Sequence, residues 1–242
     1  MTPEPLRWLR LGWADLWASP LPALLHGLAA TLFGWALLLV AHDRFWWLAG
    51  AFSGFLLVAP IWASGLYLIS RARARGEVAG LPEVWRLWRR RDPRLVRFGL
   101  LLALAGTGWV LTSAALITVW SPQAIGQPVD FLRLVVLAPG VGLFEVWLLL
   151  GALLAAPVFA SSVLTLPMLV DTDRPLGDCV RASWAAVASR PVEMALWALL
   201  IAVLVGLGMA TAMLGLVLVV PWLGHASWHA YRSVYPDNLD KR

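Results

Sequence analysis

The sequence contains little charge. Only 14% of its 242 residues are Asp, Glu, Lys or Arg, whereas 60% are hydrophobic. A soluble globular domain carries roughly a quarter charged residues and roughly half apolar ones. The composition therefore excludes an ordinary soluble domain and indicates that much of the chain faces hydrocarbon instead of water.

Cysteine is almost absent as well. Cys179 is the single thiol, which excludes an intramolecular disulfide and a cysteine-rich metal cage. The sequence also lacks a phosphate-binding glycine loop ending in Lys-Ser or Lys-Thr, a Gly-x-Ser-x-Gly elbow and a His-Glu-x-x-His motif. We therefore expect no enzymatic activity, no catalytic residues, no metal site and no cofactor.

Long apolar runs without charge are the main feature that is present. Four runs are each long enough to cross about 30 Å of hydrocarbon as a helix, which takes about 20 residues, and a fifth is about twice that length. These runs cover Ser19–Ala41, Phe45–Ser70, Phe98–Trp120, Val146–Val170 and Met194–Tyr231. A glycine cluster around Gly206–Leu214 predicts a turn that divides the last run. We predict an all-α integral membrane protein with six transmembrane helices.

The basic residues are distributed unevenly along the chain. Seventeen of the nineteen Lys and Arg residues lie at the two ends or in alternate connections, and only Arg44 and Arg133 lie in the others. Basic loops remain on the cytoplasmic side of a membrane, so we predict that both termini are cytoplasmic. Because orientation accounts for the net charge of +5, we expect no nucleic-acid partner.

Tryptophan is abundant, with sixteen residues in the chain. Several of these lie near predicted span ends, namely Trp8, Trp13, Trp17, Trp46, Trp47, Trp85, Trp88, Trp120 and Trp228. This placement is typical of the aromatic belts at the two membrane surfaces. We expect these side chains to anchor the protein in the bilayer.

A pattern recurs three times, with glycine six positions before proline. The segments read GFLLVAPIWASG from Gly54, GALLAAPVFASS from Gly151 and GLVLVVPWLGHA from Gly215. A short amphipathic segment precedes each pair of spans, and Pro20, Pro93 and Pro191 are expected to begin the helix that follows. We predict a single membrane domain, 1–242, with three pseudo-repeated units at about 5–70, 81–170 and 176–234. Each unit is a cytoplasmic interfacial helix plus a transmembrane hairpin.

Parts of the sequence resemble a known bacterial family. The resemblance is carried by Phe52–Pro60, Leu166–Leu169 and Gly215–Arg232, within a region from about Phe45 to Arg232. These segments are similar to the family labelled domain of unknown function 2189. The resemblance implies a multi-pass protein of the bacterial inner membrane, and some members are described as cytochrome oxidase proteins. It brings no established activity and no catalytic residues.

Three polar residues stand one turn beyond the repeated prolines. Proline inside a transmembrane helix leaves a backbone carbonyl without its usual partner. If the repeats surround a common axis, Ser64, Ser161 and His225 converge on a small polar site for a lipid headgroup or solute. In the alternative structural interpretation the kinked helices pack through small residues, and the serines bond to their own backbones.

Histidines and arginines provide two further candidate sites. His225 and His229 share one helix face, and His26 is predicted at a depth like that of His225, which suggests a haem or metal site. Otherwise these imidazoles bond to a backbone carbonyl or a lipid phosphate. A basic connection supplies candidates for binding anionic lipid headgroups: Arg71, Arg73, Arg75, Arg86, Arg89, Arg90 and Arg91.

Three hypotheses for function follow. The predicted membrane midplane carries almost no charge, so our leading hypothesis is a non-catalytic accessory or assembly subunit that contacts the lipid bilayer and other membrane protein subunits. The resemblance directs this hypothesis toward a respiratory or other bioenergetic complex. The alternatives are a small lipid or solute carrier that uses Ser64, Ser161 and His225, and a haem- or metal-binding protein that uses His26, His225 and His229.

Overall fold

The computed structural model describes residues 3–41, 45–121, 123, 125–138 and 142–236, and the side chains at 41, 45–49, 52–60 and 128 also lie outside the description. The described chain is helical, with no β-strand. Its elements are α1 (Glu4–Ala18), α2 (Pro20–Ala41), α3 (Phe45–Ala74), α4 (Leu81–Arg89), α5 (Pro93–Trp120), α6 (Pro128–Phe131), a π-helix (Leu132–Val136), α7 (Leu143–Ser162), α8 (Thr165–Asp171), α9 (Leu176–Ser189), α10 (Pro191–Ala210) and α11 (Leu216–Val234).

Three of the long helices begin at proline. Pro20, Pro93 and Pro191 are the first residues of α2, α5 and α10, as the sequence predicted. Proline is favourable there because the first turn of a helix leaves its N–H groups without an intrahelical partner. At α5 the carboxylate of Asp92 accepts a hydrogen bond from the backbone N–H of Arg94 at 2.8 Å, which caps the helix.

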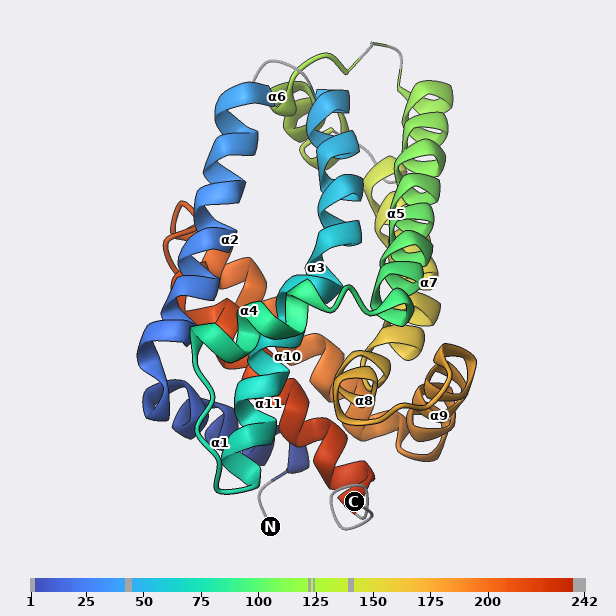
Figure 1. Ribbon diagram of the computed structural model, residues 1–242. Coiled ribbons are helices and arrows are strands. Elements are labelled where there is room, and N and C mark those ends of the chain that lie inside the picture. The colour runs from blue at the N-terminus through green and yellow to red at the C-terminus, as the bar shows by residue number, and fades with distance from the viewer. Residues whose placement is uncertain (1–2, 42–44, 122, 124, 139–141, 237–242) are drawn as a thin grey trace.

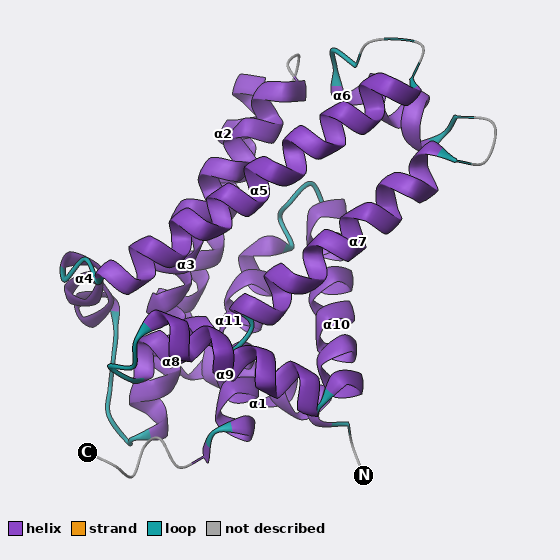
Figure 2. Cartoon of the chain, turned by 90° about the vertical axis from the view of Figure 1, so that its right-hand side faces the viewer, coloured by secondary structure: helices purple, strands orange, loops and turns teal. Residues whose placement is uncertain are grey.

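The helices pack together at one end of the molecule. Figure 1 shows α1, α4, α8 and α9 near this end, from which α2, α5 and the first part of α3 extend away. Figure 2 shows α7 and α10 extending in the same general direction. The main hydrophobic core lies at the packed end and includes the fully buried side chains Trp8, Phe98, Leu164, Met168, Trp197, Trp228 and Tyr231. We call this part the compact end.

The last helix, α11, lies at the centre of the compact end. Close approach to its neighbours depends on glycine. A Cβ atom added at Gly12 of α1 would lie 2.5 Å from the backbone nitrogen of Ala226, and one added at Gly27 of α2 would overlap the carbonyl oxygen of Val217. The helices α1 and α2 therefore contact the backbone of α11 directly, which small residues permit.

Four helices are long and apolar enough to cross a membrane. These candidate spans are Pro20–Val40, Pro93–Trp120, Leu143–Asp171 and Pro191–Ala210. Only 11% to 22% of the residues in their most apolar windows are buried inside the chain. Such apolar, uncovered surface is suited to lipid or to other transmembrane helices. The predicted spans in α3 and α11 are not among the four, and part of α3 lies outside the described side chains.

A tight turn divides the last apolar run, close to the predicted position. Ala212 and Met213 in this turn have φ values of 52° and 67°. Two side chains of α2 donate hydrogen bonds to backbone carbonyls of the turn: Thr31 to Met213 at 3.2 Å and Trp35 to Ala212 at 2.8 Å. These bonds provide partners for carbonyls that lie between two apolar helices, where water is scarce.

Candidate functional site

An aspartate on the buried face of α1 forms the first polar cluster. The Asp15 carboxylate accepts a hydrogen bond from the Ser70 hydroxyl at 2.6 Å, lies 2.9 Å from Nε2 of His229, and pairs with Nε of Arg73 at 2.9 Å. The Ser70 hydroxyl is also 2.8 Å from Nδ1 of His225. We call these five residues the Asp15 cluster. It joins α1, α3 and α11.

The cluster maintains Asp15 as a carboxylate although the side chain is only 6% exposed. Burial acts to raise the pKa of Asp15, but hydrogen bonds from His229 and Ser70 outweigh it and hold the pKa below its ordinary value. Because the Ser70 hydroxyl donates its proton to Asp15, Nδ1 of His225 must donate to the Ser70 oxygen. The Nε2 atom of His225 is buried and has no hydrogen-bond partner among the described residues.

A second buried carboxylate joins α8 to α3 and α11. The Asp171 side chain at the end of α8 is completely buried and lies 3.4 Å from Nε of Arg71 and 3.6 Å from Nη2 of Arg75. The Tyr231 hydroxyl of α11 donates a hydrogen bond to it at 2.8 Å. Arg71 also donates to the backbone carbonyl of Val170 at 2.8 Å. We call this group the Asp171 cluster, and it connects α3, α8 and α11.

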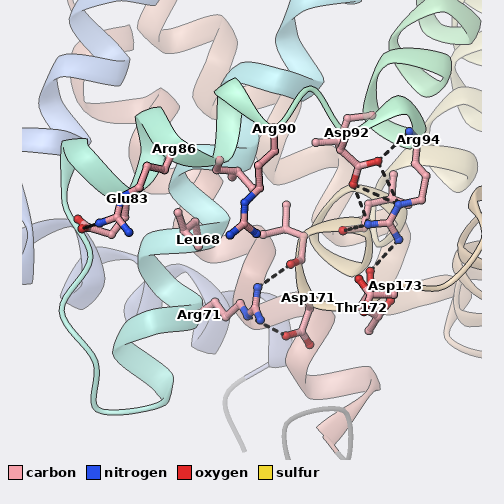
Figure 3. A pocket seen from close by; sticks show the side chains of 14 residues that line it. Leu68, Arg71, Glu83, Arg86, Arg90, Asp92, Arg94, Asp171, Thr172 and Asp173 are labelled. Atoms are coloured by element: carbon pink, nitrogen blue, oxygen red, sulfur yellow. Dashed lines mark hydrogen bonds and ion pairs between the residues drawn. The ribbon is translucent and has the colours of Figure 1, made fainter. Parts of the chain in front are cut away.

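A pocket of about 460 Å³ opens beside the Asp171 cluster, between α4, α3 and the end of α8. Its arginines are Arg71, Arg86, Arg90 and Arg94, and its acidic residues are Glu83, Asp92, Asp171 and Asp173. We call it the arginine pocket. Figure 3 shows the Arg90 side chain extending from α4 into the space that Arg71 also enters. The volume falls within the range of about 300–1,000 Å³ that is common for small-ligand sites.

Most charges of the arginine pocket are paired. Arg94 forms an ion pair with Asp92 at 2.7 Å and donates to the backbone carbonyls of Leu169, Thr172 and Arg174 at 3.0, 2.8 and 2.9 Å. A cation is favourable there because carbonyls at the end of a helix carry partial negative charge. Burial acts to raise the pKa of Asp92, but the bonds from Arg94 lower it overall. Arg86 pairs with Glu83.

The residues of the predicted threefold polar site have different partners. Ser64 donates to the carbonyl of Ile61 in its own helix. Ser161 accepts a hydrogen bond from the Trp184 indole of α9 at 2.9 Å. His225 belongs to the Asp15 cluster. The bonds of the described side chains do not link these three residues, so their convergence stays a prediction.

The three histidines of the haem or metal hypothesis divide into two groups. His225 and His229 both belong to the Asp15 cluster. Nδ1 of His26 is 2.6 Å from the carbonyl oxygen of Pro22, and its ring packs against Trp62 and Trp88 with centroid distances of 5.0 and 5.6 Å. Among the described residues, no group of three His, Cys, Asp or Glu side chains is arranged to hold a metal ion.

The arginines predicted to bind lipid headgroups also divide into two groups. Arg71 and Arg75 pair with Asp171, and Arg73 pairs with Asp15. In contrast, three arginines at the end of α4 are exposed: Arg89, Arg90 and Arg91. The first group stabilises the compact end, and the second remains accessible from outside the chain.

Sequence reasoning missed both buried aspartates. Asp15 lies on the same face of α1 as Trp8, Gly12 and Leu16, and all four are buried. An acidic residue on the apolar face of an amphipathic helix was therefore the available signal. Asp171 directly follows an apolar run, where it resembled an ordinary boundary residue.

Comparison with known proteins agrees with the resemblance found in the sequence. Residues 47–171, just over half of the chain, match the family described as "Predicted integral membrane protein (DUF2189)". The chain belongs to this family. The match ends before Gly215–Arg232. This segment of the resemblance therefore lies outside the matched residues. Searches of the curated proteins and of the solved structures found no match.

Proposed function

We propose that this chain is a non-catalytic accessory or assembly subunit of a larger complex in the bacterial inner membrane. It crosses the bilayer six times, as three units that each combine a cytoplasmic interfacial helix with a transmembrane hairpin. Its termini and basic loops are cytoplasmic. Membership of an integral membrane protein family and the four candidate spans support this placement.

The main support is the contrast between the compact end and the long helices. The buried carboxylates Asp15 and Asp171 are bonded within the chain. The long helices, in contrast, carry apolar side chains that are mostly uncovered. Helices in lipid associate through close packing at small residues, and the chain has no described atom within 4 Å of an added Cβ at Gly108 of α5 or Gly206 of α10. These positions leave space for a neighbouring helix.

Gentle detergent extraction followed by native mass measurement tests the subunit role. We expect the chain to co-purify with at least one other membrane protein in a defined ratio. The substitution Gly206→Leu should release the partner and preserve the fold, because no described side chain contacts that position. Leu207→Ala, which removes bulk at an exposed neighbour on α10, is the matched control. A monodisperse wild-type monomer without any partner would contradict the proposal.

Cysteine labelling tests the topology separately. In a Cys179→Ser background, a membrane-impermeant maleimide should label Gln123→Cys from outside intact cells. It should label Glu77→Cys only after the inner membrane is opened. Both positions are exposed, one between α5 and α6 and the other between α3 and α4. The reverse labelling pattern would invert the proposed orientation.

A further inference from the structure

Arg90 differs from the other arginines of the arginine pocket. Arg71, Arg86 and Arg94 each pair with an acidic residue, and Asp171 is shared between Arg71 and Arg75. No ion pair or hydrogen bond joins the Arg90 side chain to any part of the chain that the structure describes. The guanidinium nevertheless points into the pocket (Figure 3). Arg90 is therefore the arginine of the pocket to which the described part of the chain bonds no carboxylate, although Asp173 also lines the pocket.

The chemistry of the pocket favours a phosphate group as the ligand. A guanidinium presents several N–H donors in a planar fork that matches phosphate oxygens. Arg86 lies one helical turn before Arg90 and lines the same pocket, so both side chains can approach one anion.

The position of α4 indicates that this phosphate belongs to a lipid. Leu81 and Trp85 on α4 are 40% and 59% exposed, although both are large and apolar. Trp is favoured at the level of the lipid headgroups. The candidate span in α5 begins at Pro93, directly after α4. The pocket is thus next to the start of a span, where basic pockets on the cytoplasmic side hold anionic headgroups.

We propose that the arginine pocket binds the phosphate of an anionic phospholipid headgroup, with Arg90 as the principal ligand and Arg86 as its neighbour. This inference rests on the membrane placement of the proposed function. In this proposal α4 binds the lipid: its apolar residues lie in the membrane surface, and its C-terminal end contacts the headgroup.

The experiment compares two adjacent arginines at the end of α4, Arg89 and Arg90. Purified protein in neutral detergent is titrated with phosphatidylglycerol, phosphatidylcholine or inorganic phosphate, and binding is followed by native mass spectrometry and by the shift in melting temperature. We expect wild type to prefer phosphatidylglycerol. Arg90→Gln should weaken this binding about fivefold or more, which corresponds to about 1 kcal/mol for one basic residue. Arg90→Lys should retain part of it.

Arg89→Gln is the matched control, because Arg89 is an exposed arginine next to Arg90 that does not line the pocket. It should change binding by less than about twofold, as a screened surface charge does. Equal losses in Arg89→Gln and Arg90→Gln would overturn the assignment, as would equal binding of the two lipids. Saturation by inorganic phosphate at the same concentration would assign the pocket to a soluble anion and overturn the lipid assignment.

The lipid-binding measurement does not depend on partner proteins or on the orientation of the chain in the membrane. Binding is measured on isolated chains, so its failure leaves the co-purification result unaffected. Conversely, a monomeric protein that still binds phosphatidylglycerol through Arg90 would contradict the subunit proposal and support the lipid site.

Discussion

The Asp15 cluster allows a stability change to be worked out from the structure. In Asp15→Ala, the Ser70 hydroxyl loses its acceptor while it remains only 1% exposed. A buried donor without a partner costs about 1–3 kcal/mol. Arg73 is 51% exposed and can turn to water, so its lost ion pair is worth at most about 1 kcal/mol. We expect Asp15→Ala to lower the free energy of unfolding by about 1–4 kcal/mol.

Thermal unfolding in a mild detergent measures this loss. For a chain of this length, 1 kcal/mol corresponds to about 2–4 °C in melting temperature, so we expect a decrease of about 2–16 °C for Asp15→Ala. The control is Glu4→Ala on the same helix. Glu4 pairs with Arg7 at 3.5 Å on the surface, with exposed fractions of 34% and 56%, and its removal should cost less than about 1 kcal/mol.

The comparison between these two variants tests the reasoning directly. Both remove one carboxylate from α1, but only Asp15 links α1 to α3 and α11. Asp15→Asn should lie between Asp15→Ala and wild type, because the amide can still accept a hydrogen bond from Ser70. If Asp15→Ala and Glu4→Ala melt at the same temperature, the Asp15 cluster does not stabilise the compact end.

Four further predictions concern the same fold. Because folding lowers the pKa of Asp15, the carboxylate stabilises the folded state fully above its ordinary pKa of 3.8, and this stabilisation is lost as the pH falls through the lower pKa of the folded state. The difference in melting temperature between wild type and Asp15→Asn should therefore shrink as the pH is lowered below about 4. Gly27→Ala should melt several degrees lower, since its Cβ overlaps the Val217 carbonyl, whereas Gly206→Ala should be neutral or slightly stabilising because its Cβ meets open space. Tyr231→Phe should cost about 1.5–3 kcal/mol, measured by thermal unfolding, because the buried Asp171 loses a hydrogen bond; a change below that of Glu4→Ala would contradict this. Burial raises the pKa of the Cys179 thiol and covers it completely, so maleimide should modify it only after unfolding.

Features that depend on neighbouring residues could be predicted from the sequence. The prolines that begin α2, α5 and α10 act within one turn, and the four candidate spans follow from the length of apolar runs. The division of the last run near residue 212 also followed from local composition. These predictions needed no knowledge of which helices pack together.

Features that depend on distant residues could not be predicted. Asp15 and His229 are separated by 214 positions, and no local pattern indicates that they meet. Trp8 and Trp228 resembled residues of an aromatic belt, but helix packing buries both in the core. The arginines at the end of α3 and directly after it contained a partial signal, because Arg71 and Arg75 are four positions apart and both contact Asp171.

The contact between α1 and α11 has a consequence for biosynthesis. Gly12 lies against Ala226, so α1 meets α11 only after the segments from α2 to α10 have been synthesised. Until then Asp15 lacks its bond to His229, and Gly12 has no α11 backbone against it. We expect a nascent chain that stalls before α11 to keep this face of α1 uncovered, which chaperones and proteases can recognise.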